Sequence, residues 1–299
     1  MKIYSFAVLL LFFAMSTSCL AQGYLKTDYL FSSSLKDEEG NTFGSGDLIK
    51  TSAGFNLPLS VKKNSLGQVK AWSATLNGSY GVLNNKDITA IVNPEEIVNV
   101  TLSVAHIRPL SERWYLIASL GAGIYSEPNS ITAKSILASG GVIFVYKVRN
   151  NLDLGIGVGL TNSFGVPIIM PMAYVKWQLT GKYEVTADIA NGVEVSGSVK
   201  LGKRFRVKLT AIEMDGMSAV MNIDDKSMIY ASAIIKSHLT PELRIGKSST
   251  FYLGGGGAWA RSVKLSKRSF KGFLNTFKED NDLNFRPTGY LTVGFRYGF

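Results

Sequence analysis

Apolar and polar side chains alternate with a period of two along most of the chain. In the run 152–160, leucine, isoleucine and valine hold the even positions, with aspartate or glycine between them. In the run 193–201, valine and leucine alternate with glutamate, serine and lysine. Successive side chains of a strand point to opposite faces, so this pattern predicts strands with one apolar and one polar face. A soluble β-sandwich shows the same alternation, which therefore predicts an all-β fold without choosing its architecture.

Two kinds of connection separate the predicted strands. Short ones, rich in glycine, asparagine, serine or proline, have the composition of tight turns; they are centred on 62–68, 109–112, 149–151, 180–181, 202–203 and 246–249. Longer ones span about 34–47, 83–94, 126–133, 162–166, 191–192, 213–226 and 262–286.

Seven long and six short connections predict a strand count. An outer-membrane barrel has short turns on the periplasmic side, which also holds both termini, and longer loops outside. A barrel of n strands then has n/2 loops and one turn fewer, so the count predicts about 14 strands. Twelve strands is the alternative, because Pro241 interrupts the run that follows Met228.

Composition narrows the class of protein. The chain is 46% hydrophobic and 18% charged, with 30 glycines, which is too apolar for a disordered protein and unlike a helical bundle. Beyond the first 21 residues no apolar run approaches the ~18 residues of a membrane-spanning helix. The formal net charge of +10 is spread along the chain rather than gathered on a basic helix, so we expect no nucleic-acid partner.

The first residues have the pattern of a secretory signal peptide. Lys2 supplies a positive start, residues 6–15 are apolar, and Cys19-Leu20-Ala21 forms a small-residue cleavage site. We therefore expect a signal peptide over 1–21 and a barrel over 22–299. The alternative is a lipoprotein anchored at Cys19, although Ser16 and Ser18 occupy positions where that motif prefers other residues. Cleavage before Gln22 leaves no cysteine, and therefore no disulfide.

The last residues alternate with an aromatic-rich face. The segment resembles the C-terminal signal by which bacterial outer-membrane barrels are recognised for insertion, a resemblance that rests on Thr292, Gly294, Tyr297 and Phe299. The resemblance implies the barrel-assembly machinery as a partner. It also implies that the final strand closes the barrel, because closure removes the open edge of the sheet.

Both ends together resemble an uncharacterised family of outer-membrane barrels common in Bacteroidota. The features that carry the resemblance are Ala21-Gln22, the tyrosine-rich first strand from Tyr24, and the terminal residues 294–299. It implies a bacterial outer-membrane location, with membrane lipid and lipopolysaccharide as partners, and carries over no catalytic, cofactor or metal residue. The strand count also resembles hydrophobic-substrate channels, but those begin with a plug that this first strand does not leave room for.

One group of charges falls on the polar face of three consecutive predicted strands. A lysine or arginine facing lipid at the membrane midplane costs ~2–4 kcal/mol, so these charges are expected to face the lumen. There they either form a salt ladder that fills the barrel or line a path for solutes. The predicted lumen residues are Glu184, Asp188, Glu194, Lys200, Arg206 and Lys208.

The remaining candidate residues point to structure rather than chemistry. His106 and His238 are expected to be structural, near the turns. The glycine runs 155–159 and 254–257 lie within strands, so they are not phosphate loops. Aromatic residues near the turns are expected to form the girdle at the membrane interface; they are Trp72, Trp114, Tyr115, Trp177, Tyr183 and Tyr252.

Charged loop segments have two readings each. The acidic groups 37–39 and 224–225 are expected to be solvated rather than to bind Ca²⁺. The basic residues of the last loop either meet lipopolysaccharide phosphates or are solvated; they are Lys264, Lys267, Arg268, Lys271 and Lys278. We predict a non-enzymatic barrel without a cofactor, acting as a passive pore or small-solute channel. The alternatives are a filled structural or surface-interaction barrel and, least favoured, a lipid-modifying membrane enzyme.

Overall fold

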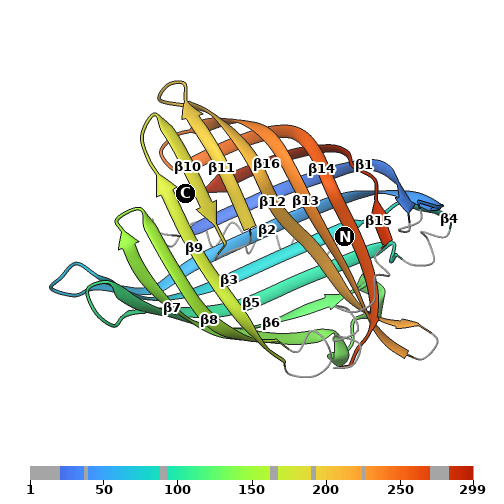
Figure 1. The fold of residues 1–299 in the computed structure, drawn as a ribbon, viewed down its shortest axis with the longest axis horizontal. Coiled ribbons are helices and arrows are strands. Elements are labelled where there is room, and N and C mark those ends of the chain that lie inside the picture. Colours follow the sequence, from blue (N-terminus) through green and yellow to red (C-terminus); the bar gives the residue numbers. More distant parts are fainter. Residues whose placement is uncertain are drawn as a thin grey trace.

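The computed structural model describes residues 21–36, 40–87, 93–161, 168–189, 193–223, 226–269 and 283–298. In this part of the chain, fourteen long strands form one closed antiparallel barrel, in which β1 pairs with β2 on one side and with β16 on the other (Figure 1). The predicted closed barrel of 14 strands is confirmed. Pro241 lies inside β13 rather than ending it, opposite Val207 of β12.

The wall strands range from six residues in β10 to 22 in β2. The long strands are β1 (Gln22–Lys36), β2 (Thr42–Lys63), β3 (Val69–Val82), β5 (Glu96–Pro109), β6 (Trp114–Ser126), β7 (Ile136–Arg149), β8 (Leu152–Thr161), β9 (Ile168–Leu179), β10 (Tyr183–Asp188), β11 (Val193–Lys200), β12 (Phe205–Ile223), β13 (Lys226–Ile245), β14 (Ser249–Lys267) and β16 (Thr288–Tyr297). Short additional strands are β4 (Asn85–Asp87) and β15 (Leu283–Phe285). Two single 3₁₀ turns, η1 (Pro128–Ser130) and η2 (Ala133–Ser135), follow β6. No helix within the described ranges is long and apolar enough to span a membrane.

The barrel has two different ends. At the turn end, tight turns near 64–68, 110–113, 150–151, 180–182, 201–204 and 246–248 lie beside the start of β1 and the end of β16. At the far end, two of the predicted loops are in large part strand. The predicted loop 213–226 is wrong, because β12 continues to Ile223 and β13 begins at Lys226. Likewise β14 extends to Lys267, well into the predicted loop 262–286.

The outer surface carries a belt of exposed apolar side chains. On β8, Ile156 is 76% exposed, and the inward positions between the exposed residues are glycines, as the alternation predicts. Further exposed members come from all sides of the barrel, among them Leu25, Leu76, Leu102, Leu120, Ile169, Leu209, Leu239, Leu253 and Leu291. A soluble monomer rarely exposes so continuous an apolar surface.

Four of the six aromatic residues predicted for the girdle lie on the outer surface and two do not, while their contact with a membrane interface stays a prediction. Trp72, Trp114, Trp177 and Tyr183 are exposed near the turn end, and His106 stacks on Trp72 with ring centroids 4.1 Å apart. The two exceptions are Tyr115, whose hydroxyl donates to Asp153 at 2.8 Å, and Tyr252, which lies between the exposed Phe251 and Leu253. Both point into the barrel, because inward and outward positions alternate along a strand.

Strand β12 changes course in its middle. Residues 211–212 form a bulge, since Thr210 pairs with His238 but the next pair is Glu213 with Lys236. Beyond Met214 no residue of β11 pairs with β12 in the described part of the chain. Bulges bend a strand and increase its twist, so residues 215–220, here named the crossing segment, turn into the interior.

The crossing segment contacts the opposite wall of the barrel. Lys50 of β2 donates to Asp215 at 2.6 Å, and Asn99 of β5 donates to the Ser218 carbonyl at 2.6 Å. Val220 pairs in parallel with Ser126 at the end of β6. The far half of the barrel is therefore a smaller closed ring than the turn half.

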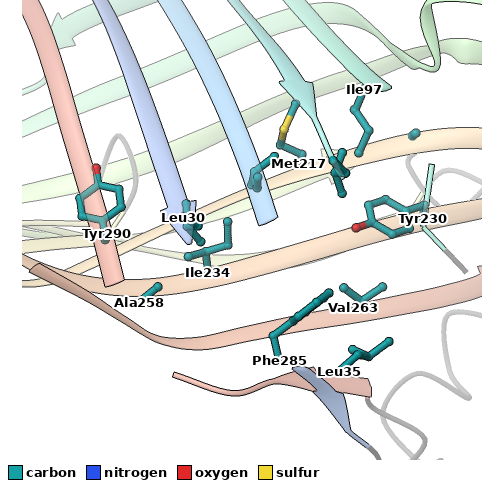
Figure 2. Close-up of a cluster of buried hydrophobic side chains, with 13 residues drawn as sticks. Leu30, Leu35, Ile97, Met217, Tyr230, Ile234, Ala258, Val263, Phe285 and Tyr290 are labelled. Atoms are coloured by element: carbon teal, nitrogen blue, oxygen red, sulfur yellow. The ribbon is translucent and has the colours of Figure 1, made fainter. Parts of the chain in front are cut away.

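Apolar side chains fill this smaller ring. Figure 2 shows Met217 of the crossing segment beside Leu30, Ile97 and Ile234, which come from three other strands. Their exposures are all 5% or less, so the cluster excludes water. The whole cluster is Leu30, Leu35, Leu48, Leu83, Ile97, Met217, Ala219, Tyr230, Ile234, Ala258, Val263, Phe285 and Tyr290.

Candidate functional site in the barrel interior

A cavity of about 670 Å³ occupies the interior at the turn end. Its wall includes turn residues 202–204 and inward side chains of β10, β11 and β12, because polar positions on these strands face the lumen. All six predicted lumen residues lie on this wall: Glu184, Asp188, Glu194, Lys200, Arg206 and Lys208. Whether they control the passage of solutes stays a prediction.

Ion pairs connect most of these side chains across strands. Lys200 and Arg206 bind the two oxygens of Glu184 at 2.7 and 3.0 Å, and Lys208 binds Glu194 at 2.7 Å. Arg206 also contacts Glu242 of β13, which in turn contacts Arg296 of β16. The pairs form a ladder along the cavity wall. They do not cross the cavity, since they join residues on neighbouring strands or on the same side of the barrel.

The wall of this cavity is positive overall. Seven basic side chains and four acidic ones line it, a net charge of +3. The added bases beyond the predicted set are Lys203, Arg204, Arg244 and Arg296, and the added acid is Glu242. A cleft lined by one sign of charge raises the local concentration of oppositely charged solutes.

A second cavity, of about 440 Å³, lies deeper in the barrel. It shares Thr186, Asp188 and Glu194 with the first cavity, so the two are adjacent. Its lining is mixed in character and reaches across the barrel from β10 to β5, where it includes Asn99 and Thr101. Together the two cavities line the interior from the turn end to Asp215 of the crossing segment.

The deeper cavity ends at a buried network of charges. Lys236 of β13, which is 1% exposed, lies 3.2 Å from Asp28, 3.2 Å from Glu213 and 3.3 Å from Asp215. Lys26 of β1 joins the same group, at 3.3 Å from Asp28 and 3.2 Å from Glu213. Lys50 also binds Asp215, at 2.6 Å, so the network contains three lysines and three carboxylates. This balance is what permits so many charges to lie away from water.

Aromatic and hydroxyl groups complete the network. Tyr290 of β16 donates to Asp28 at 2.7 Å, and its ring lies under the Lys236 ammonium at 4.8 Å. The imidazole of His238 lies 2.8 Å from Glu213 and 2.7 Å from the Thr240 hydroxyl. Thr240 is only 3% exposed, so this hydroxyl, imidazole and carboxylate are enclosed rather than presented to a substrate. His238 is thus part of the interior network.

The sequence did not reveal this network, for two reasons. Glu213 and Asp215 were placed in a loop, because the bulge at 211–212 shifts the inward positions of β12 from even to odd numbers. Lys26, Asp28 and Lys236 stand on the inward parity of their strands, with Leu25, Tyr29 and Ile235 on the outward parity beside them. Their meeting depends on the crossing segment, which joins strands that are not neighbours in the sheet.

The insertion-signal residues occupy defined places in β16. Thr292 is 3% exposed and faces the interior. Gly294 lies against the Tyr252 ring, where a side chain would overlap that ring unless the tyrosine moved. Tyr297 pairs with Gly23 of β1 and Ser249 of β14 at the closing seam. Phe299 lies outside the described residues, and recognition of these residues by an assembly machinery remains a prediction.

Several other predicted residues also lie outside the described ranges. They are the signal-peptide residues 1–20 with Cys19, the acidic groups 37–39 and 224–225, and Lys271 and Lys278. Lys264 and Lys267 lie in β14, and Arg268 donates to the Lys134 carbonyl. Within the described part of the chain, no group of three histidine, cysteine or acidic residues is arranged to hold a metal ion.

A family model matches residues 17–298 of the sequence. The chain belongs to the family described as Domain of unknown function (DUF6268). No curated protein matches the sequence significantly.

Solved structures with a similar fold include barrels of different activities. The COG4313 outer membrane channel from Pseudomonas putida F1 is 9% identical, with a TM-score of 0.45 over 93% of this chain and 94% of that one. OccK5 from Pseudomonas aeruginosa is 9% identical, with a TM-score of 0.25 over 93% and 98%. The outer membrane protease OmpT from Escherichia coli is 11% identical, with a TM-score of 0.24 over 93% and 96%. Values this low support no inference about activity.

Proposed function

We propose that this DUF6268 protein is a bacterial outer-membrane barrel that admits small solutes into its lumen from the turn end. The apolar belt supports the membrane location, because lipid-facing side chains of a spanning barrel are apolar while the lumen is polar. Short turns of such barrels face the periplasm, so the turn end is assigned to that side. The resemblance to Bacteroidota barrels, the signal peptide over 1–21 and cleavage before Gln22 belong to the same proposal.

The observation that carries the proposal is the positive cavity at the turn end. It adjoins the deeper cavity, and the two volumes of about 670 and 440 Å³ each fall in the range of small-molecule sites, about 300–1,000 Å³. Because the lining charge at the entrance is +3, the favoured solutes are small anions or zwitterions.

Entry can be tested with charged thiol reagents. Ser198 lies on β11 and lines the cavity at the turn end. Ser198→Cys in a Cys19→Ala background therefore places one thiol in the lumen. We expect the anionic methanethiosulfonate ethylsulfonate to react faster than its trimethylammonium counterpart in refolded, vesicle-inserted protein. Val158→Cys, on the exposed face of β8, serves as the control position outside the lumen. If neither reagent modifies Ser198→Cys, the lumen is filled and the proposal is wrong.

A structural or surface-interaction barrel is the second candidate. The apolar cluster and the central charge network favour it, since both fill the far half of the interior. The thiol-reagent experiment separates the two functions: reaction at Ser198→Cys requires a water-filled entrance, which a barrel filled along its whole length lacks. No arrangement in the described residues favours the lipid-modifying enzyme. Membrane lipid, lipopolysaccharide and the barrel-assembly machinery remain the proposed partners.

A further inference from the structure

Two rows of inward positions cross the wall of the deeper cavity on β1, β2, β3, β5 and β6. Strand pairing joins each residue of a row to the next. The row farther from the turn end is Lys26, Ser52, Ser79, Asn99 and Tyr125, and the row nearer to it is Tyr24, Gly54, Asn77, Thr101 and Gly123. All of them except the two glycines line the cavity. The register of five neighbouring strands therefore gathers hydroxyl and amide groups on one side of this space.

Most of the neutral groups in these rows keep their hydrogen-bonding capacity. Ser52 is 5% exposed, and its hydroxyl has no hydrogen-bond partner among the described residues although it lines the cavity. Three further side chains form no hydrogen bond within the described ranges; they are Asn77, Ser79 and Thr101. Buried polar groups normally have a partner, so these unpaired groups point to a molecule that binds in the cavity.

The charged groups that line the same cavity are, in contrast, largely paired. Lys50 binds Asp215 at 2.6 Å. Lys26 binds Glu213 at 3.2 Å, and Glu194 binds a lysine of β12 at 2.7 Å. A ligand held here by its own charge would have to displace one of these pairs. The neutral groups therefore decide which ligand fits.

We propose that the deeper cavity is a binding site for hydroxyl-rich solutes about the size of a monosaccharide. A serine or threonine hydroxyl both donates and accepts a hydrogen bond, and so does the amide of Asn77; the hydroxyl groups of a solute complement both functions. The volume of about 440 Å³ suits a small molecule. The inference rests on the proposed function and names its class of solute: the entrance selects by charge, and the deeper cavity selects by hydroxyl groups.

A matched pair of acids tests the site. Gluconate and hexanoate are open-chain monoacids of equal chain length, and gluconate differs in carrying hydroxyl groups along its chain. Their charges are equal, so the positive entrance treats them alike. We expect isothermal titration calorimetry of the refolded protein in detergent micelles to show saturable binding of gluconate and at least about tenfold weaker binding of hexanoate. Equal affinities, or no saturable binding of gluconate because the cavity holds water only, would overturn the proposal.

Two small substitutions locate the binding. Ser52→Ala combined with Thr101→Val removes two hydroxyls from the cavity and nearly preserves the shape of its wall. We expect the affinity for gluconate to fall about tenfold, while that for hexanoate stays unchanged. Ser103→Ala is the control, because Ser103 lies on the same face of β5 as Thr101 and lines neither cavity. If the double variant folds and binds gluconate as the parent does, the proposal is wrong. If it does not fold, Asn77→Ala is used with the same expectation.

The binding experiment and the entry experiment fail separately. If the thiol reagents modify Ser198→Cys but gluconate binds no more tightly than hexanoate, the entrance stands and the binding site is wrong. If the reagents do not reach Ser198→Cys while gluconate binds and depends on Ser52 and Thr101, the entrance is wrong and the binding site stands.

Discussion

The turn half and the far half of this barrel share one wall but have opposite interiors. In the turn half, ion pairs run along the wall around an open cavity, and Arg206 and Lys200 keep side-chain exposures of 32% and 48%. In the far half, Lys236 is 1% exposed among three carboxylates, and an apolar cluster fills the rest. The difference arises from one strand, because the crossing segment of β12 brings the opposite walls into contact.

This comparison shows that charge in a barrel interior has two different roles. A charge pair at a wet wall contributes little to stability, about 0–1 kcal/mol, and mainly shapes the field that a solute meets. A buried pair gives no assured net stabilisation, but removal of one partner leaves the other without compensation. The far half should therefore respond to mutation through stability and the turn half through selectivity.

The largest expected effect is the loss of the central lysine. Lys236→Ala leaves Asp28, Glu213 and Asp215 with one ammonium fewer, and breaking a buried pair costs about 3–5 kcal/mol. Lys200→Ala is the control in the turn half, because Lys200 is 48% exposed and binds a single carboxylate; about 1 kcal/mol or less is expected. Urea unfolding of vesicle-inserted protein measures both. Equal losses would contradict the distinction between the halves.

A medium effect is expected where the crossing segment meets β3. A Cβ atom at Gly81 would lie 2.6 Å from the Met217 sulfur, so Gly81→Val should destabilise the barrel by about 1–3 kcal/mol through overpacking. Gly78→Ala on the same strand is the control, since its nearest neighbour would be at 3.8 Å.

The same position gives a second check through a double mutant. In a Met217→Ala background the added side chain has room, so Gly81→Val should cost less there than in the parent. Equal costs in both backgrounds, measured by the same unfolding curves, would show that Met217 does not pack against β3.

The smallest effect on stability is expected at the entrance, where selectivity should change most. Replacing Arg206 and Lys208 with glutamate takes the lining charge from +3 to −1, since each reversal subtracts two. The cationic thiol reagent should then react with Ser198→Cys faster than the anionic one, because lumen substitutions tune selectivity. Arg206→Lys with Lys208→Arg, which keeps the charge, is the control. A large fall in stability without any change in reagent preference would favour the filled barrel.

Alternation and turn composition were enough to predict the number and the two faces of the strands, whereas the choice of a barrel over a sandwich rested on the resemblance of the last residues to an outer-membrane insertion signal. The even positions of 152–160 face outward as predicted, and six tight turns gave the strand number. These predictions succeed because strand parity and turn geometry are local properties of the chain. The alternation also indicates that Tyr115 and Tyr252 face inward. Their closeness to a turn, on which the girdle prediction rests, does not decide which face of the strand a side chain occupies.

The amino-acid sequence by itself determined the barrel, its two faces and the charges of its entrance, because each depends on neighbours along the chain or on an adjacent strand. The tertiary structure alone decided what fills the interior beyond the entrance. A bulge at 211–212 changes the parity of β12, carries residues 215–220 to the opposite wall and so creates the buried network and the apolar cluster. Contacts between strands that are distant around the barrel depend on the path of the whole wall, which no local pattern in the sequence records.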